Sequence, residues 1–455
     1  MRHYKEVGKG RLLITQKRIF YLFFLFFLCT KIFPGAEPLS LSLEEAVSRA
    51  LAQSLNLQKS AIDLELAQYR ADRLWAELFP VFNLRAGLTL LPETPLFTSP
   101  GFQYNQDGAS YSFSLGVSFQ FNGGMPYAMK ITELAYRRGL LDYESAKRRV
   151  EIDIAKSFYT LLAGRENIAH LVEIFTLSEL QLEKNSIARA NGLIGELPWL
   201  QSRLSLETAR YNLNNAQVSY DNSLKDFLTT LGMDRNIEVF LEGSINPVPI
   251  ELNPEALILE YLPKRPDIIS QRQTIERLEL VQKQGVFSSK APSVSLSAQW
   301  SAGPERNSGF SGTFTDSLSG SLSISIPIDP WIPGTKSNQT LMSANAELEK
   351  ARLDLLNTEI AAKSQIRSLS DNLRNSWRSI EIARLRVEIA QRTYQITEAG
   401  FQSGTVEFLS LENTRNDLAD ARFRLLQSEL AYHNVTLDLA AALNLDPEAL
   451  ARSKE

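Results

Sequence analysis

The chain has 455 residues, a formal net charge of −4 and 22% charged residues. This balance gives no basic stripe for nucleic acid and no acidic tail, so partners must be inferred from the shape of the fold rather than from net charge. The single cysteine, Cys29, excludes both a disulfide framework and a cysteine-based metal site.

Residues 1–36 are organised like a secretory signal. A basic start is followed by the apolar run Ile19–Cys29, and Pro34-Gly35-Ala36 offers small residues for cleavage before Glu37. An apolar run this short differs from a membrane-spanning helix, which needs about 20 residues. We therefore expect the mature protein to leave the cytoplasm.

The position of Cys29 at the end of the apolar run leaves two alternatives open. The cysteine could be acylated as a lipoprotein cysteine, or it could be removed with the signal. Leu28 is bulkier than residues usually found before an acylated cysteine. This favours removal.

The next part of the chain predicts a helix, two strands and a pair of long helices. Ser42 and Glu45 form a capping-box pattern at the start of the first helix, which is expected to continue to about Phe79. Apolar residues then alternate with polar ones before helical spacing returns. The expected strands, long helix and return helix lie at about 81–90, 112–121, 127–191 and 199–231. The long helix would extend about 95 Å at 1.5 Å per residue.

The same order recurs later in the chain. Pro80 and Pro292 both precede alternating strands, and Gly192 and Gly404 both end long helical runs; each pair is 212 residues apart (292 − 80 and 404 − 192). We therefore predict a tandem repeat. Its parts are a first repeat at 37–232, a connector at 233–262, a second repeat at 263–445 and a tail at 446–455. In the second repeat we expect a helix at 266–285, strands at 293–300 and 321–328, a long helix at 337–400 and a return helix at 410–443.

The expected strands have the length and alternation of outer-membrane strands. Their polar faces carry Ser, Thr, Asn, Gln and Gly, and their apolar faces carry Phe, Leu, Ile and Trp. A soluble sheet with one buried face looks similar, so a secreted soluble coiled-coil scaffold or adhesin is the alternative. Four strands cannot close a barrel, and open edges in lipid are costly. A membrane role therefore requires several copies to share a barrel, with loops outside and helices in the periplasm.

The sequence resembles a known family. The opening Leu41-Ser-Leu-Glu-Glu-Ala-Val, the prolines that begin the strands and the two tip glycines are similar to the TolC-like outer membrane efflux proteins. The resemblance implies a homotrimer in which a 12-stranded transmembrane β-barrel continues into an α-helical periplasmic barrel. It also implies a periplasmic adaptor and an inner-membrane transporter as partners, in a tripartite efflux or type I secretion system that exports drugs, metals or polypeptides.

The resemblance also implies which residues contact the adaptor and which line the periplasmic aperture. It places adaptor contacts at the helical tips, at Gly192, Leu197, Gly404 and Leu409. Family members often have an acidic residue shortly after the tip glycine, lining the periplasmic aperture, where this chain has Pro198 and Ser410. The nearest candidates for the aperture are Glu196, Glu407, Ser410 and Glu412. Each of these carboxylates could equally be a solvated group at a helix end.

Residues for catalysis are not evident. His170 and His433 are far apart in sequence, which does not suggest a metal site. The sequence has no phosphate-binding glycine loop, nucleophile elbow or paired catalytic carboxylates at meaningful spacing. We expect no enzymatic activity and no cofactor, so that energy comes from the partner. Trp331 suits an interfacial aromatic belt, and Trp199 is expected to pack at a tip.

Overall fold

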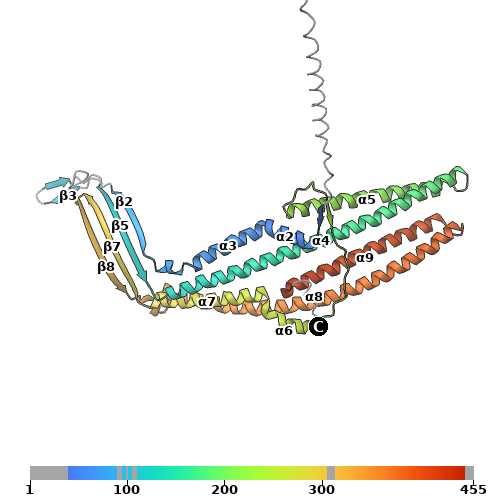
Figure 1. The fold of residues 1–455 in the computed structure, drawn as a ribbon. Coiled ribbons are helices and arrows are strands. Elements are labelled where there is room, and N and C mark those ends of the chain that lie inside the picture. Colours follow the sequence, from blue (N-terminus) through green and yellow to red (C-terminus); the bar gives the residue numbers. More distant parts are fainter. Residues whose placement is uncertain (1–38, 90–94, 99–100, 105–109, 305–312, 446–455) are drawn as a thin grey trace, which may run out of the picture.

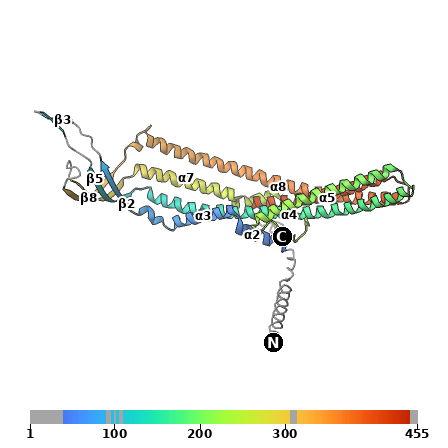
Figure 2. The same cartoon turned by 90° about the horizontal axis from the view of Figure 1, so that it is seen from above.

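The computed structural model is an elongated molecule with a β-sheet at one end and two helical hairpins at the other (Figures 1 and 2). The structure describes residues 39–89, 95–98, 101–104, 110–304 and 313–445. The expected signal at 1–36, Cys29 and the expected tail at 446–455 lie outside the described residues.

The first helical segment contains the predicted capping box. Helix α2 (Leu43–Gln53) begins after Ser42, whose hydroxyl accepts from the Glu45 backbone N–H at 3.2 Å, while the Glu45 carboxylate accepts from the Ser42 N–H at 3.3 Å. The prediction of a single helix as far as Phe79 was wrong. Ser54 adopts φ −62° and ψ 110°, and its hydroxyl caps the new helix α3 (Leu55–Ala71). A 3-10 turn, η1 (Leu74–Leu78), then precedes the sheet.

Four antiparallel strands form one sheet with the order β2-β5-β7-β8. The strands are β2 (Val81–Thr89), β5 (Ser110–Phe121), β7 (Ser293–Pro304) and β8 (Phe314–Ser325). Strands from the two halves of the chain meet at the β5–β7 pair. Strands β2 and β8 are the edges of this sheet.

The strand expected at 321–328 is found at Phe314–Ser325, so it begins and ends earlier than expected and only residues 321–325 coincide. Strand β8 begins at Phe314 and pairs with β7 along its whole length, so part of the segment between the two expected strands is also strand. Asp316 and Gly320 interrupt the apolar face, and the alternation is therefore visible mainly on the polar face. The segment between the first two expected strands likewise contains a small hairpin, β3 (Pro95–Thr98) with β4 (Gly101–Tyr104).

Two very long helices carry the chain away from the sheet. Helix α4 (Met125–Ala190) has 66 residues and α8 (Lys336–Gln402) has 67, which corresponds to about 100 Å each at 1.5 Å per residue. The return helices are α5 (Glu196–Thr230), which packs on α4, and α9 (Phe408–Leu443), which packs on α8. Helix α7 (Pro266–Lys290) lies along both α4 and α8.

The middle of the molecule contains structure that the sequence did not predict. The segment expected to be a connector includes β6 (Val239–Leu241), which pairs in parallel with β1 (Leu39–Leu41), and α6 (Pro254–Tyr261) followed by η2 (Leu262–Lys264). The buried core is concentrated here. One cluster includes Leu41, Ile154, Phe158, Phe227 and Leu241, and a second includes Ile366, Leu373, Ile380, Tyr432 and Leu439.

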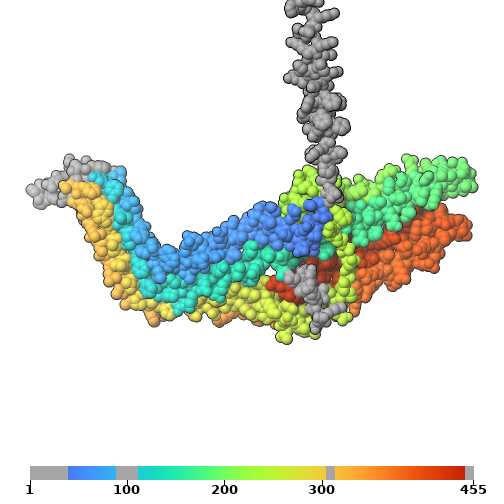
Figure 3. Space-filling model, in the orientation of Figure 1, coloured from blue at the N-terminus to red at the C-terminus, as the bar shows by residue number. Residues whose placement is uncertain are grey.

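The space-filling view shows the sheet as a thin extension of the helical body (Figure 3). Side chains on both faces of β8 are exposed along its whole length. Within the part of the chain that the structure describes, none of the helices is both long enough and apolar enough to cross a membrane.

Candidate functional site

One face of the sheet is an exposed apolar surface. Its large side chains would be buried in most soluble proteins, yet here they are exposed in the single chain. They are Phe82, Leu84, Leu88, Phe113, Leu115, Phe121, Leu296, Trp300, Phe314, Leu318, Leu322 and Ile324. A contiguous exposed apolar surface marks a site that meets lipid or another protein.

The opposite face of the sheet is lined by hydroxyl groups. Serines on β7 and β8 lie directly opposite each other and hydrogen-bond through their side chains. The Oγ–Oγ distances are 2.6 Å for Ser295–Ser323, 2.7 Å for Ser297–Ser321 and 2.9 Å for Ser301–Ser317. This face is therefore polar and uncharged over most of its area, as expected for a surface that meets water.

Only two side chains in the four strands are charged. Arg85 is at the centre of β2 on the polar face, opposite Ser114 of β5. Asp316 of β8 is on the apolar face, where its carboxylate accepts a hydrogen bond from Trp300 Nε1 at 3.2 Å. The two charges therefore point to opposite sides of the sheet.

Exposed aromatic residues gather where the sheet meets the helices. The Trp75 and Phe79 rings are in edge contact at 5.5 Å between centroids, and the Phe79 ring is 6.0 Å from that of Phe82. Trp331 is exposed, and the Lys290 ammonium lies 4.9 Å from its ring centroid. Aromatic rings with cationic neighbours suit a lipid headgroup boundary.

The two helical tips are turns of the same kind. At the first, the Gly192 N–H donates to Arg189 O at 2.9 Å and the Leu193 N–H donates to Ala188 O at 2.8 Å, the hydrogen bonds of a Schellman motif. The second tip repeats this pattern around Gly404. Gly192 has φ +71° and Gly404 has φ +75°, values that side chains other than glycine rarely adopt.

The tips present apolar and ionic groups to solvent. Leu193, Leu197 and Leu409 are exposed. Trp199 packs at the first tip: the Arg189 guanidinium lies 4.2 Å from its ring centroid and its Nε1 donates to Ser186 Oγ at 3.2 Å. Exposed leucines beside fixed charges are suited to contact another protein.

The four candidate aperture residues do not share one environment. Glu196 is exposed and 3.5 Å from Arg189 Nη2. Glu407, at the N-cap position of α9, and Ser410 are also exposed. Glu412 differs, because it is only 8% exposed. Its carboxylate is therefore held inside the chain and is not presented at the tip surface.

Glu412 belongs to a buried polar cluster that joins the two hairpins. Arg415, 7% exposed, donates from Nη2 to Glu412 Oε2 at 2.6 Å and to Ser205 Oγ of α5 at 2.6 Å, and the Ser205 hydroxyl donates to Glu412 Oε2 at 2.5 Å. Sequence reasoning missed this cluster because Ser205 and Glu412 are distant in the chain. The i, i+3 spacing of Glu412 and Arg415 was the available signal.

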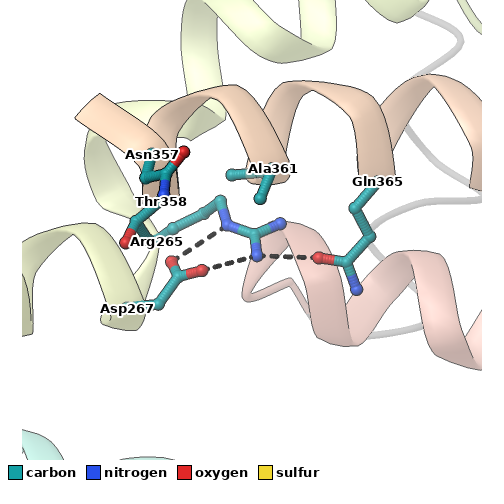
Figure 4. Close-up of a pocket in the computed structure, with 7 residues that line it drawn as sticks. Arg265, Asp267, Asn357, Thr358, Ala361 and Gln365 are labelled. Atoms are coloured by element: carbon teal, nitrogen blue, oxygen red, sulfur yellow. Dashed lines mark hydrogen bonds and ion pairs between the residues drawn. The ribbon is translucent and has the colours of Figure 1, made fainter. Parts of the chain in front are cut away.

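A second polar contact, centred on the buried Arg265, lies at the middle of the molecule. Figure 4 shows Arg265 between Asp267 and Gln365: its Nε and Nη2 donate to the Asp267 carboxylate at 3.0 and 2.7 Å, and Nη2 also donates to Gln365 Oε1 at 2.9 Å. Burial alone would raise the pKa of Asp267, but the hydrogen bonds and charge of Arg265 outweigh it and lower that pKa. Arg265 Nη1 donates to Ala442 O at 2.9 Å, so the residue ties α7 to α8 and to the end of α9.

The two histidines among the described residues, His170 and His433, occupy separate places. His433 of α9 is packed against the Tyr159 ring of α4, 3.7 Å between ring centroids, and burial lowers the pKa of His433 to about 4. His170 lies elsewhere on α4. Among the described residues, no group of three or more His, Cys, Asp or Glu side chains is arranged to hold a metal ion.

Comparison with known proteins decides the family. The sequence pattern of the outer membrane efflux proteins matches residues 46–233 and 260–445. The chain belongs to the outer membrane efflux protein family. It is 24% identical over 418 residues to the outer membrane protein TolC of Escherichia coli (strain K12), an alignment that covers 86% of this chain and 80% of TolC.

Solved structures of outer membrane proteins share the fold. The CmeC outer membrane channel of Campylobacter jejuni superposes with a TM-score of 0.70 at 18% identity, covering 90% of this chain and 88% of CmeC. The outer membrane protein VceC of Vibrio cholerae superposes with a TM-score of 0.68 at 19% identity, covering 88% of this chain and 95% of VceC. Membership of this family, rather than the shared fold, makes the chain a channel protein of the outer membrane with a periplasmic portion, and not an enzyme. A secreted soluble scaffold does not fit this family.

Proposed function

We propose that three copies of the chain form a passive export duct, as the outer membrane component of a tripartite efflux or type I secretion system. The observation that carries this proposal is a four-stranded sheet that is exposed and apolar on one face, polar on the other, and open at two edges. In lipid the apolar face is stabilised. The open backbone edges must pair with other copies, because unpaired groups cost several kcal/mol each.

Several copies of the sheet can join edge to edge into a closed barrel in which every neighbouring pair of strands is antiparallel. The order β2-β5-β7-β8 is antiparallel throughout, so β8 of one copy runs antiparallel to β2 of the next copy. A barrel of about eight strands is filled by its own side chains, whereas larger barrels enclose a channel. Three copies supply twelve strands, the smallest multiple of four beyond eight. The hydroxyl-lined face then surrounds the lumen.

The long helices continue the duct into the periplasm. Large apolar side chains stay exposed along α8, including Leu353, Leu356, Ile360, Leu385 and Ile389. Neighbouring copies would bury these side chains in a closed helical wall. The paired order of strands and long helices in the two halves of the chain supports the tandem repeat, whose halves alternate around that wall.

The tips supply the docking surface in this proposal. Gly192, Leu197, Gly404 and Leu409 would meet a periplasmic adaptor, with Glu196, Glu407 and Ser410 near the aperture. The adaptor would connect the duct to an inner-membrane transporter, which supplies the energy. Trp75 and Trp331 would mark the periplasmic boundary of the bilayer.

Electrical recording tests the proposed duct directly. Protein purified from outer membranes in mild detergent and added to a planar lipid bilayer should insert in discrete steps, each adding the same conductance. A water-filled lumen is the physical reason for the current. Detergent without protein is the control. A protein that inserts as an intact oligomer but conducts no ions would overturn the proposal.

A further inference from the structure

We propose that Arg85 forms, in the three-copy barrel, a ring of guanidinium groups that attracts anions into the membrane segment of the duct. This inference rests on the proposed function, since a single chain supplies one member of the ring. The ligand class is small anionic solutes, together with cargo that carries carboxylate or phosphate groups. Chloride is the simplest probe.

The position of Arg85 in the sheet places its side chain in the lumen. Arg85 is the central residue of β2 and shares a face with Asn83 and Gly87, while Leu84 and Ala86 point to the apolar face. Across the sheet its row continues through Ser114, Ser301 and Ser317. Arg85 is exposed on this hydroxyl-lined face.

Along the described strands, the polar face contains no carboxylate that could neutralise Arg85. On the described strands β2, β5, β7 and β8, this face otherwise consists of uncharged residues, chiefly serines that hydrogen-bond to one another. The only acidic residue of these strands, Asp316, is on the apolar face and is engaged by Trp300. Within the sheet, the guanidinium therefore keeps its full positive charge.

The neighbouring copy does not neutralise Arg85 either. Strand β2 is an edge, so in the closed barrel its second neighbour is β8 of the next copy. The polar face of β8 carries Thr315 and then serine at every second position up to Ser325. Because a pleated neighbour keeps polar residues on the same side, Arg85 meets a hydroxyl group in every register that places it opposite the polar residues of Thr315–Ser325.

A ring of unpaired cations in a narrow, low-dielectric wall has a predictable effect. Fixed charges of one sign concentrate oppositely charged solutes near them, and rings of Arg or Lys are used in anion-conducting pores. The surrounding serines offer hydrogen bonds without adding charge. The barrel segment should therefore favour anions, independently of the acidic groups at the helical tips.

Reversal potentials in planar bilayers test this ring. With a potassium chloride gradient across the bilayer, Arg85→Gln should lower the chloride-to-potassium permeability ratio by about two- to tenfold relative to the parent protein. Arg85→Glu should lower this permeability ratio further, and Arg85→Lys should preserve it. The reason is that the charge of the side chain, rather than its shape, sets the preference for anions. Asp316→Asn is the matched control, since it removes a charge from the lipid-facing side and should leave the ratio unchanged.

The outcomes separate the inference from the proposed function. Each variant is first shown to form the same oligomer and to insert as often as the parent protein. If Arg85→Glu then conducts with the permeability ratio of the parent, the ring is contradicted while the duct stands. If the parent protein does not conduct at all, the duct itself fails. A change for Asp316→Asn as large as that for Arg85→Gln would also overturn the ring.

Discussion

Replacing Arg415 with methionine is expected to lower the free energy of unfolding by about 3–5 kcal/mol. The substitution removes the cation that neutralises the buried Glu412 carboxylate and leaves that charge with only the Ser205 hydroxyl. A buried charge without its partner carries a large desolvation cost, whereas methionine roughly preserves the packing of the side chain. Urea unfolding of the detergent-solubilised protein, followed by circular dichroism of the helices, measures the change.

Two further variants show whether burial of the ion pair is the reason for this loss of stability. Arg210→Met removes a similar ion pair on α5, with Glu207, but there both side chains are more than half exposed, so the loss should stay below about 1 kcal/mol. The double variant Glu412→Leu with Arg415→Met removes both buried charges and should recover most of the stability. If Arg415→Met is as stable as the parent protein, or if the double variant is as unstable as the single one, the buried pair does not have the role described.

Replacing Gly404 with valine should reduce export at least several-fold while leaving the amount of assembled protein in the outer membrane unchanged. Gly404 has φ +75°, and apart from its chain neighbours no described atom lies within 4 Å of where a Cβ would be, so the cost within the chain is backbone strain. A left-handed conformation costs an L-residue roughly 1–2 kcal/mol, and a β-branched residue is especially unsuited to it. The tip turn would rearrange and displace the exposed Leu409. The measurement is the amount exported by the variant, compared with the parent protein, when each is expressed in a strain that lacks the parent gene.

The same tip region supplies matched controls. Gly195 also has open space at its Cβ position, but its φ is −76° and its ψ is 179°, so Gly195→Val should be tolerated. Gly404→Asn should retain most of the export, because asparagine enters the left-handed region more readily than valine. Export that is normal for Gly404→Val, or equally poor for Gly195→Val, would remove the role given to the tip turn.

The sequence alone predicted elements with a strong and uninterrupted period. The strand expected at 81–90 is found at Val81–Thr89, and the long helix expected at 127–191 is found at Met125–Ala190. The start of β8 was missed because Asp316 and Gly320 break its apolar face. The break at Ser54 was missed because the apolar spacing continues across it, while the hydroxyl cap decides the local structure.

The candidate site was less predictable than the fold. The tip glycines could be found because positive φ favours glycine at a helix end, and both Gly192 and Gly404 have positive φ. The burial of Glu412 could not, because its partner Ser205 comes from another hairpin. Arg85 was visible as a charged residue on a polar strand face, but its isolation depends on which strands are neighbours. Sheet order is a property of tertiary structure that local patterns do not contain.

If several copies of the chain share one barrel, the molar mass of the assembled protein is a multiple of that of one chain. The protein is extracted from isolated outer membranes with mild detergent, and its mass is measured by light scattering with correction for bound detergent. The two open edges of the β2-β5-β7-β8 sheet require other copies, and a barrel of twelve strands gives three copies in each particle. A stable monomer, or a particle recovered without detergent, would contradict the shared barrel.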